Sequence, residues 1–295
     1  MNWAVAHRIA GIAAIQAHRD LGIDRNRYVP VHQALRTASL TGMAQPMPRL
    51  FGVYFSPADN GPAVLLNAGL NIVTQRHTAA HELGHHRLRH HTAADDDINP
   101  ALRWGNGAWP EEEKTAEAFA AWFLMPRPAV LTALEWICQG RPDSPVHVYR
   151  LARVLGTSYA GTVRHLQHLR LLDATRARAW AKGSPADLRS YLTQGAALPP
   201  HAHVHVLTAR TREQHVHADV GDLLVLDDAE GRLIGLPKGL ALWPGVNGSL
   251  SAVKVTEELE GVRTLQFSCA RSQEVTEVSV HRESPRLGID EVWPE

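Results

Sequence analysis

Hydrophobic residues make up 44% of this 295-residue chain and charged residues 20%, which is typical of globular proteins with buried cores and predicts one to three domains. Thirty basic side chains balance thirty acidic ones, so the neutral chain has no overall attraction to nucleic acids or membranes. Two distant cysteines exclude a disulfide framework. With no signal pattern and no 18-residue apolar run, the sequence predicts a cytoplasmic protein with no membrane association.

The N-terminal part predicts two helices followed by two strands. Helical spacing of apolar residues predicts a helix over 3–21, and a second helix is predicted over 31–39. The apolar positions of the first helix are Trp3, Ile9, Ile12, Ala13 and Leu21. The segment 42–48 is rich in Gly, Met and Pro and predicts a loop, whereas 50–55 and 63–67 predict strands separated by a turn.

The next segment, 74–91, is predicted to be a helix that carries a His-Glu-x-x-His motif. His81 and His85 are four residues apart, so on a helix their imidazoles leave the same face one turn apart. Two neutral imidazoles at this spacing can hold one Zn²⁺, and Glu82 can point at a zinc-bound water as a general base. Small and apolar neighbours indicate a buried helix, which disfavours the alternative of a solvated His/Glu face.

Other residues of this helix suggest supporting roles. His77 lies on the ligand stripe, and we interpret it as a solvated histidine or one that contacts a ligand; the alternative is an extra ligand or transition-state donor. His90 and His91 predict a solvated helix end, where imidazolium complements the helix dipole. Gly84 in the helix interior costs about 1 kcal/mol relative to Ala, which indicates that something packs closely there, as it would beside a metal.

A helix bounded by prolines is predicted over 109–126 and supplies a third ligand. Glu113 lies on a stripe otherwise made of Ala and Leu, where a buried carboxylate needs a cation, so we predict it as a zinc ligand. Glu117, one turn further on, is predicted to accept the second ring N–H of a ligating histidine. The alternative is that residues 111–113 only complement the helix dipole.

Residues 146–172 predict a helix, a turn at Gly156 and a second helix, in the manner of a helix-turn-helix. Four of its arginines are candidates for contacts with DNA phosphates: Arg150, Arg153, Arg164 and Arg170. Because the whole chain is neutral, we favour the alternative in which these helices pack within the protein.

Beyond a partly helical linker that ends near residue 200, the polar and apolar side chains alternate as they do in strands. Two groups of alternating histidines stand out there: His201, His203 and His205, and then His215 and His217. Three histidines on one strand face can bind a metal, but we favour the interpretation of a half-exposed polar strand face.

The two motif helices resemble those of the ImmA/IrrE metallopeptidases. The resemblance is carried by 80–85 and 113–126 and covers roughly residues 1–172. It implies that His81, His85 and Glu113 are the zinc ligands and that Glu82 is the general base. It further implies that the protein substrate is a helix-turn-helix (Xre-type) repressor or an antitoxin, whose cleavage derepresses stress, phage or mobile-element genes.

Together these features predict an α+β protein. Its zincin-like metallopeptidase core, a small sheet with active-site helices, is expected over 1–140, a helix-turn-helix-like segment and linker over 141–198, and a β-rich domain over 199–295. The expected function is that of a zinc-dependent endopeptidase. Two alternatives stay open: a regulatory DNA- or protein-binding factor with little peptidase activity and weak or indirect DNA association, and a zinc-protease toxin of a toxin–antitoxin or phage-defence pair.

Overall fold

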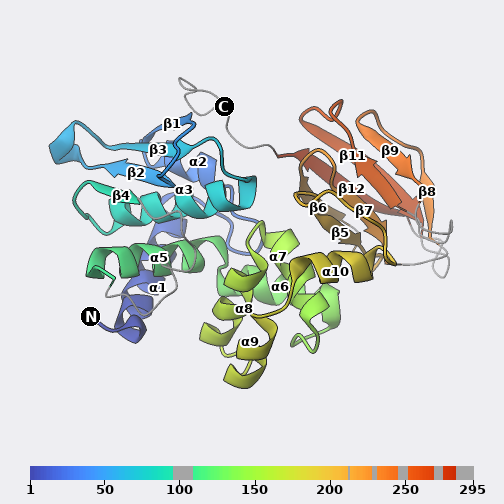
Figure 1. The fold of residues 1–295 in the computed structure, drawn as a ribbon, viewed down its shortest axis with the longest axis horizontal. Helices are drawn as coiled ribbons and strands as arrows, with labels where there is room; N and C mark the ends of the chain where they lie inside the picture. Colours follow the sequence, from blue (N-terminus) through green and yellow to red (C-terminus); the bar gives the residue numbers. More distant parts are fainter. Residues whose placement is uncertain (96–108, 212, 228–230, 245–251, 269–274, 284–295) are drawn as a thin grey trace. The chain divides into compact units, whose positions relative to one another are not determined.

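The computed structural model describes residues 1–95, 109–211, 213–227, 231–244, 252–268 and 275–283, and its fold is mixed α+β (Figure 1). The chain divides into two compact units, one containing Met1–Val130 and the other Leu131–Ser284. The helix-turn-helix-like segment and the β-rich region therefore lie in one compact unit, while the three domain limits expected from the sequence stay a prediction. No helix in the described part of the chain is long and apolar enough to cross a membrane.

The first unit is built around a mixed four-stranded sheet with the order β1-β3-β2-β4, in which β1 and β3 are parallel. Its elements are α1 (Trp3–Asp20), α2 (Val31–Thr37), β1 (Thr41–Gln45), β2 (Gly52–Phe55), a short 3-10 turn (Pro57–Asp59), β3 (Ala63–Asn67), α3 (Ile72–Arg87), β4 (Ala93–Asp95) and α5 (Glu111–Leu124). Helix α3 lies between the sheet and α5, and α1 packs against α5 (Figure 1).

Helix α3 begins and ends earlier than the predicted range 74–91. The side chain of Asn71 caps its start by accepting a 3.0 Å hydrogen bond from the Thr74 amide. The helix ends at Arg87, and Arg89 follows in the left-handed conformation with a φ of 59°. The prediction that His90 lies on a solvated helix end was therefore wrong, because the helix has already ended and the His90 side chain contacts His85.

Strand β1 replaces the first part of the loop that the composition of 42–48 predicts, whereas residues 46–48 lie outside any strand. It pairs in parallel with β3, from Thr41 opposite Ala63 to Gln45 opposite Asn67. Glycine and proline favour a loop in this stretch when the segment is considered without a neighbouring strand. Hydrogen bonds to a strand some twenty residues away favour the extended conformation, and local composition does not reveal them.

Helix α1 is present as predicted, but alanines form its buried face. Its fully buried positions include Ala6, Ala10 and Ala14, whereas Ile9 and Ile12 are 41% and 61% exposed. Small side chains let the backbones of α1 and α5 approach closely, which explains why the larger residues point outward.

The second unit combines helices with two four-stranded sheets, ordered β5-β7-β10-β9 and β6-β12-β11-β8. Its helices are α7 (Pro145–Leu155), α8 (Tyr159–His168), α9 (Ala174–Trp180) and α10 (Pro185–Leu192), and α6 (Arg127–Cys138) spans the boundary between the units along the chain. Its strands are β5 (Val204–Leu207), β6 (Glu213–Ala218), β7 (Leu223–Leu226), β8 (Arg232–Ile234), β9 (Leu240–Trp243), β10 (Ala252–Val255), β11 (Val262–Ser268) and β12 (Val275–Arg282).

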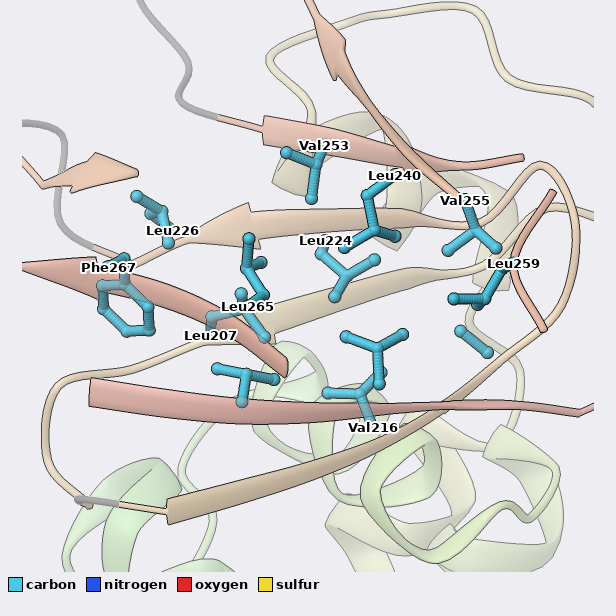
Figure 2. Close-up of a cluster of buried hydrophobic side chains, with 13 residues drawn as sticks. Leu207, Val216, Leu224, Leu226, Leu240, Val253, Val255, Leu259, Leu265 and Phe267 are labelled. Carbon is cyan, nitrogen blue, oxygen red and sulfur yellow. The ribbon is translucent and has the colours of Figure 1, made fainter. Parts of the chain in front are cut away.

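The inward faces of both sheets share one hydrophobic core. Leu224 and Val253 come from one sheet, and Val216, Leu265 and Phe267 from the other (Figure 2). Every second residue of β6 and β12 is buried, and the residues between them face outward. This alternation confirms the expected β-rich region and decides which of its polar side chains reach solvent.

Helix α7 packs against strands β5 and β6, and its Arg150 reaches the β region. Arg150 pairs with Asp227 at 3.1 Å, and Arg153 donates a hydrogen bond to the backbone oxygen of Thr157. The two arginines are only 8% and 7% exposed. These two side chains are therefore buried within the unit, which agrees with the packing interpretation of the helix-turn-helix, and an association with DNA stays a prediction.

His205, the histidine of β5, does not lie on a half-exposed polar face. His205 is 5% exposed, and its Nε2 lies 3.2 Å from Oδ2 of the buried Asp222. The backbone amide of His203 donates a 2.7 Å hydrogen bond to the other oxygen of the same carboxylate. That interpretation was wrong for His205, because its strand face is covered rather than exposed.

We expect the stability of the protein to fall with decreasing pH because of His203. Burial and the positive charge of Arg153 lower the pKa of His203 to about 3. In the unfolded chain histidine titrates near 6.5, so between pH 6.5 and about 3 the unfolded state binds a proton that the folded state does not. Stability is then fully present above pH 6.5 and falls by at most about 1.4 kcal/mol per pH unit below it.

Urea unfolding at pH 7 and pH 5 measures this slope. The variant His203→Gln should lose stability less steeply than the wild type over this interval, while His201→Gln, which alters a neighbouring exposed histidine, should keep the wild-type slope. Equal slopes in all three proteins would show that His203 is protonated in the folded state.

Candidate metal centre

Two histidines of α3 and one glutamate of α5 bring their ligand atoms together. His81 Nε2 lies 3.0 Å from His85 Nε2 and 3.1 Å from Glu113 Oε2, and His85 Nε2 lies 3.4 Å from Glu113 Oε1. Among the described residues, this is the one group of three His, Cys, Asp or Glu side chains whose ligand atoms all lie within 4.8 Å of one another. Both histidines are 1% exposed and the glutamate side chain 23%, so the cluster is buried on the α3 side and opens beside α5.

The close approach of α3 and α5 produces this convergence. A Cβ atom built on Gly84 would lie 3.0 Å from Phe119 Cδ1 and 3.2 Å from Ala116 Cα. The tight packing that the helix glycine predicts is therefore made by α5 itself, rather than by a metal beside the glycine. With the helices this close, Glu113 in the first turn of α5 reaches the histidine face of α3.

Hydrogen bonds and burial determine the protonation of the two histidines and the glutamate of the cluster. Burial opposes ionisation of Glu113, but bonds to His81 and His85 outweigh it and hold the pKa of Glu113 well below its ordinary value. Burial likewise opposes a charge on His81, yet bonds to Glu113 and Glu117 raise the pKa of His81 well above 6.5. Burial lowers the pKa of His85. A cation that binds all three ligands therefore competes with the proton on His81.

Glu117 and His77 lie behind the ligand cluster. Glu117 Oε2 is 3.5 Å from His81 Nδ1 and 2.9 Å from His77 Nε2. The carboxylate thus faces the ring nitrogen of His81 that points away from Glu113, the position predicted from the sequence. His77 contacts Glu117 and stays outside the group of three ligands, with 31% of its side chain exposed. The roles of both residues stay predictions.

Glu82 is 1% exposed and lies against strand β2. A Cβ atom built on Gly52 would lie 2.7 Å from Glu82 Oε1 and 2.6 Å from Thr78 Cγ2. The carboxylate fits between α3 and the sheet because residue 52 has no side chain. The sheet therefore holds the predicted general base in a site shielded from bulk water, and this contact involves a residue that the sequence does not single out.

The substitution Gly52→Ala is expected to displace Glu82 and lower any activity that depends on it. Heavy atoms closer than 3 Å cannot be accommodated without a shift, and Thr78 is fully buried, so the strand or the glutamate has to move. Gly11→Ala is the matched control, because its Cβ atom would meet Trp122 at an ordinary 3.6 Å. We expect thermal unfolding to show a loss of about 1–3 kcal/mol for Gly52→Ala only. Equal stability and activity in both variants would contradict the tight contact.

Residues that sequence reasoning missed complete the surroundings of His85. His90 Nδ1 lies 3.1 Å from His85 Nδ1, and His90 Nε2 lies 3.4 Å from the Thr115 hydroxyl. The ring of Tyr54 stacks beside His85 with centroids 6.3 Å apart. A proton on His85 Nδ1 that is shared with His90 leaves Nε2 with a lone pair for a metal. The left-handed Arg89 returns His90 to the helix, and no local pattern reveals that turn.

Residues 48–162 match the family described as the IrrE N-terminal-like domain, peptidase family M78. This range includes β2, β3, α3 and α5, and so all residues of the ligand cluster. The fold and the candidate metal site thus define a protein of the metallopeptidase type. Residues 48–162 therefore form a domain of the ImmA/IrrE type. None of the curated proteins with which the chain was compared matches it.

Proposed function

We propose that this protein is a zinc-dependent endopeptidase that hydrolyses a peptide bond in a protein substrate. The observation that carries the proposal is the convergence of His81, His85 and Glu113 within a domain that matches a metallopeptidase family. Glu82, which directly follows the first ligand, is the proposed general base.

The donor set fits zinc. Two imidazole nitrogens and a carboxylate oxygen are among its preferred ligands, and three protein ligands with an open fourth position are typical of catalytic sites. Ligands held about 2.0–2.1 Å from a tetrahedral zinc are separated by roughly 3.3 Å. The observed separations between ligand atoms, 3.0, 3.1 and 3.4 Å, lie near this value.

Zinc, when bound, would polarise the substrate carbonyl and make a water molecule acidic near pH 7. Glu82 would accept the proton of the attacking water at a carboxylate oxygen and deliver it to the nitrogen of the leaving amine. Glu117 would accept the Nδ1 proton of His81 and so orient that ring. The burial of Glu82 would keep the transferred proton from exchanging with bulk water.

We propose as substrate a helix-turn-helix (Xre-type) repressor or an antitoxin in the cytoplasm. This substrate class is the one that the resemblance of the two motif helices to the ImmA/IrrE metallopeptidases implies. Cleavage would remove the repressor from its operator and switch on stress, phage or mobile-element genes.

The proposal is tested by mass spectrometry of new protein N-termini in a lysate of the source cells. Purified full-length protein should create new N-termini inside one or a few helix-turn-helix proteins. A zinc chelator should suppress them, and added Zn²⁺ should restore them. A metal-loaded protein that creates no chelator-sensitive N-termini would argue against an endopeptidase and for a regulatory binding protein.

A further inference from the structure

A second group of histidines lies on the outer face of the sheet formed by β6 and β12. His215 and His217 are two residues apart on β6, and both face away from the core that Val216 joins. His281 of β12 lies directly opposite His217 in the parallel pairing of the two strands. Three imidazoles therefore share one solvent-facing surface, although His281 is more than sixty residues from the other two along the chain.

The ring nitrogens of this group already approach one another. His215 Nδ1 lies 3.0 Å from His281 Nε2, and the rings of His217 and His281 stack with their centroids 4.6 Å apart. Two ring nitrogens at 3.0 Å cannot both carry a proton on the facing side, so one of them presents a lone pair. The separation equals that between the two α3 histidines of the candidate metal centre.

We propose that His215, His217 and His281 form a second, surface site for a divalent transition metal. His215 and His281 are the two primary ligands, and rotation of the His217 imidazole supplies the third nitrogen. That rotation is required, because three ligand atoms converge within 4.8 Å only at the first site among the described residues. Water completes the coordination of the ion.

The chemistry of the ligands selects the class of metal. Neutral imidazoles favour Zn²⁺, Cu²⁺ and Ni²⁺ over Mg²⁺ and Ca²⁺, which prefer oxygen ligands. The paired strands β6 and β12 hold the ligands of this site on a fixed backbone. The three proposed ligands include no carboxylate, and the ring of His217 has to reorient before it can bind. The second site is therefore expected to bind zinc more weakly than the cluster of α3 and α5.

This proposal does not depend on the proposed peptidase function. The second site consists of residues of the Leu131–Ser284 unit alone, and the first site of residues of the Met1–Val130 unit alone. Loss of one site by mutation is thus expected to leave the other unchanged.

Equilibrium dialysis against Zn²⁺ followed by elemental mass spectrometry tests the proposal on the full-length chain. The wild type should bind about two zinc ions per chain, one at each three-ligand site. His215→Gln and His281→Gln should each lose about one ion and keep the first site, and Glu113→Ala should keep only the second. His201→Gln, a change at an exposed histidine outside the group, is the matched control and should bind as the wild type does.

Binding of Cu²⁺ identifies the ligands of the second site by an independent method. With the first site removed by His81→Ala, His85→Ala and Glu113→Ala together, electron paramagnetic resonance of bound Cu²⁺ should show coupling to imidazole nitrogens. Adding His281→Gln should remove the bound Cu²⁺ and with it the coupling. A wild type that binds zinc only at the first site would overturn the proposal, as would a second ion that persists in both His215→Gln and His281→Gln. If His281→Gln fails to fold, the exposed His215 still decides the outcome.

Discussion

Replacing Glu82 by glutamine is expected to lower peptidase activity by about 10²–10⁴-fold, the range that general acid–base catalysis contributes. The amide has the shape of the carboxylate and fits the same space beside Gly52, but it cannot accept the proton of the attacking water. The ligand cluster does not include Glu82, so the metal content should stay unchanged. The expected result is an inactive, folded and metal-loaded protein.

The rate at which a new N-terminus appears in the identified substrate measures this effect, and elemental analysis reports the metal. Glu112→Gln is the matched control, because the side chain of Glu112 is exposed on α5 and lies outside the ligand cluster. Activity of Glu82→Gln within tenfold of the wild type would place the general base elsewhere.

Replacing Glu113 by alanine is expected to weaken metal binding more than about 100-fold, beyond the 10–100-fold typical of groups that only support a ligand. The substitution removes the carboxylate that contacts both histidine nitrogens, at 3.1 and 3.4 Å. The remaining pair of imidazoles would bind a divalent ion as two ligands on one helix, without an anion to offset its charge.

Isothermal titration of each dialysed variant with Zn²⁺ measures this loss. Glu112→Ala removes a carboxylate of the same helical turn that lies outside the cluster, so it should bind with wild-type affinity. If Glu113→Ala still binds Zn²⁺ tightly, Glu113 is not the third ligand. Glu117 would then be the candidate, because its Oε2 is 3.5 Å from His81 Nδ1. Loss of binding in both variants would indicate a general electrostatic effect rather than coordination.

The sequence predicts the two ligand-bearing helices because the pattern that identifies each helix lies within a single short segment. The spacing of His81 and His85 places both imidazoles on one face of any helix, and Glu113 is a carboxylate on an otherwise apolar stripe. The structure contains both helices, and it brings these three side chains together as expected. Strands 50–55 and 63–67 are likewise visible as short apolar runs between turn residues.

Features that depend on distant contacts were decided by the tertiary structure alone. Strand β1 exists because β3 pairs with it, and α1 buries alanines because α5 approaches closely. Gly52 makes room for Glu82, and the turn at Arg89 returns His90 to His85. Composition and periodicity describe one segment of the chain at a time. They therefore do not predict any of these contacts between distant segments.

The histidines of the β region show the same limit. Alternation along the strands identifies which residues share a face, but it does not say whether that face is covered. His205 is buried beside Asp222, while His215 faces outward and meets His281. The sequence by itself thus determined the chemistry and local spacing of the candidate ligands. The packing of helices and the pairing of strands decided which of them meet, because those contacts join residues that are far apart along the chain.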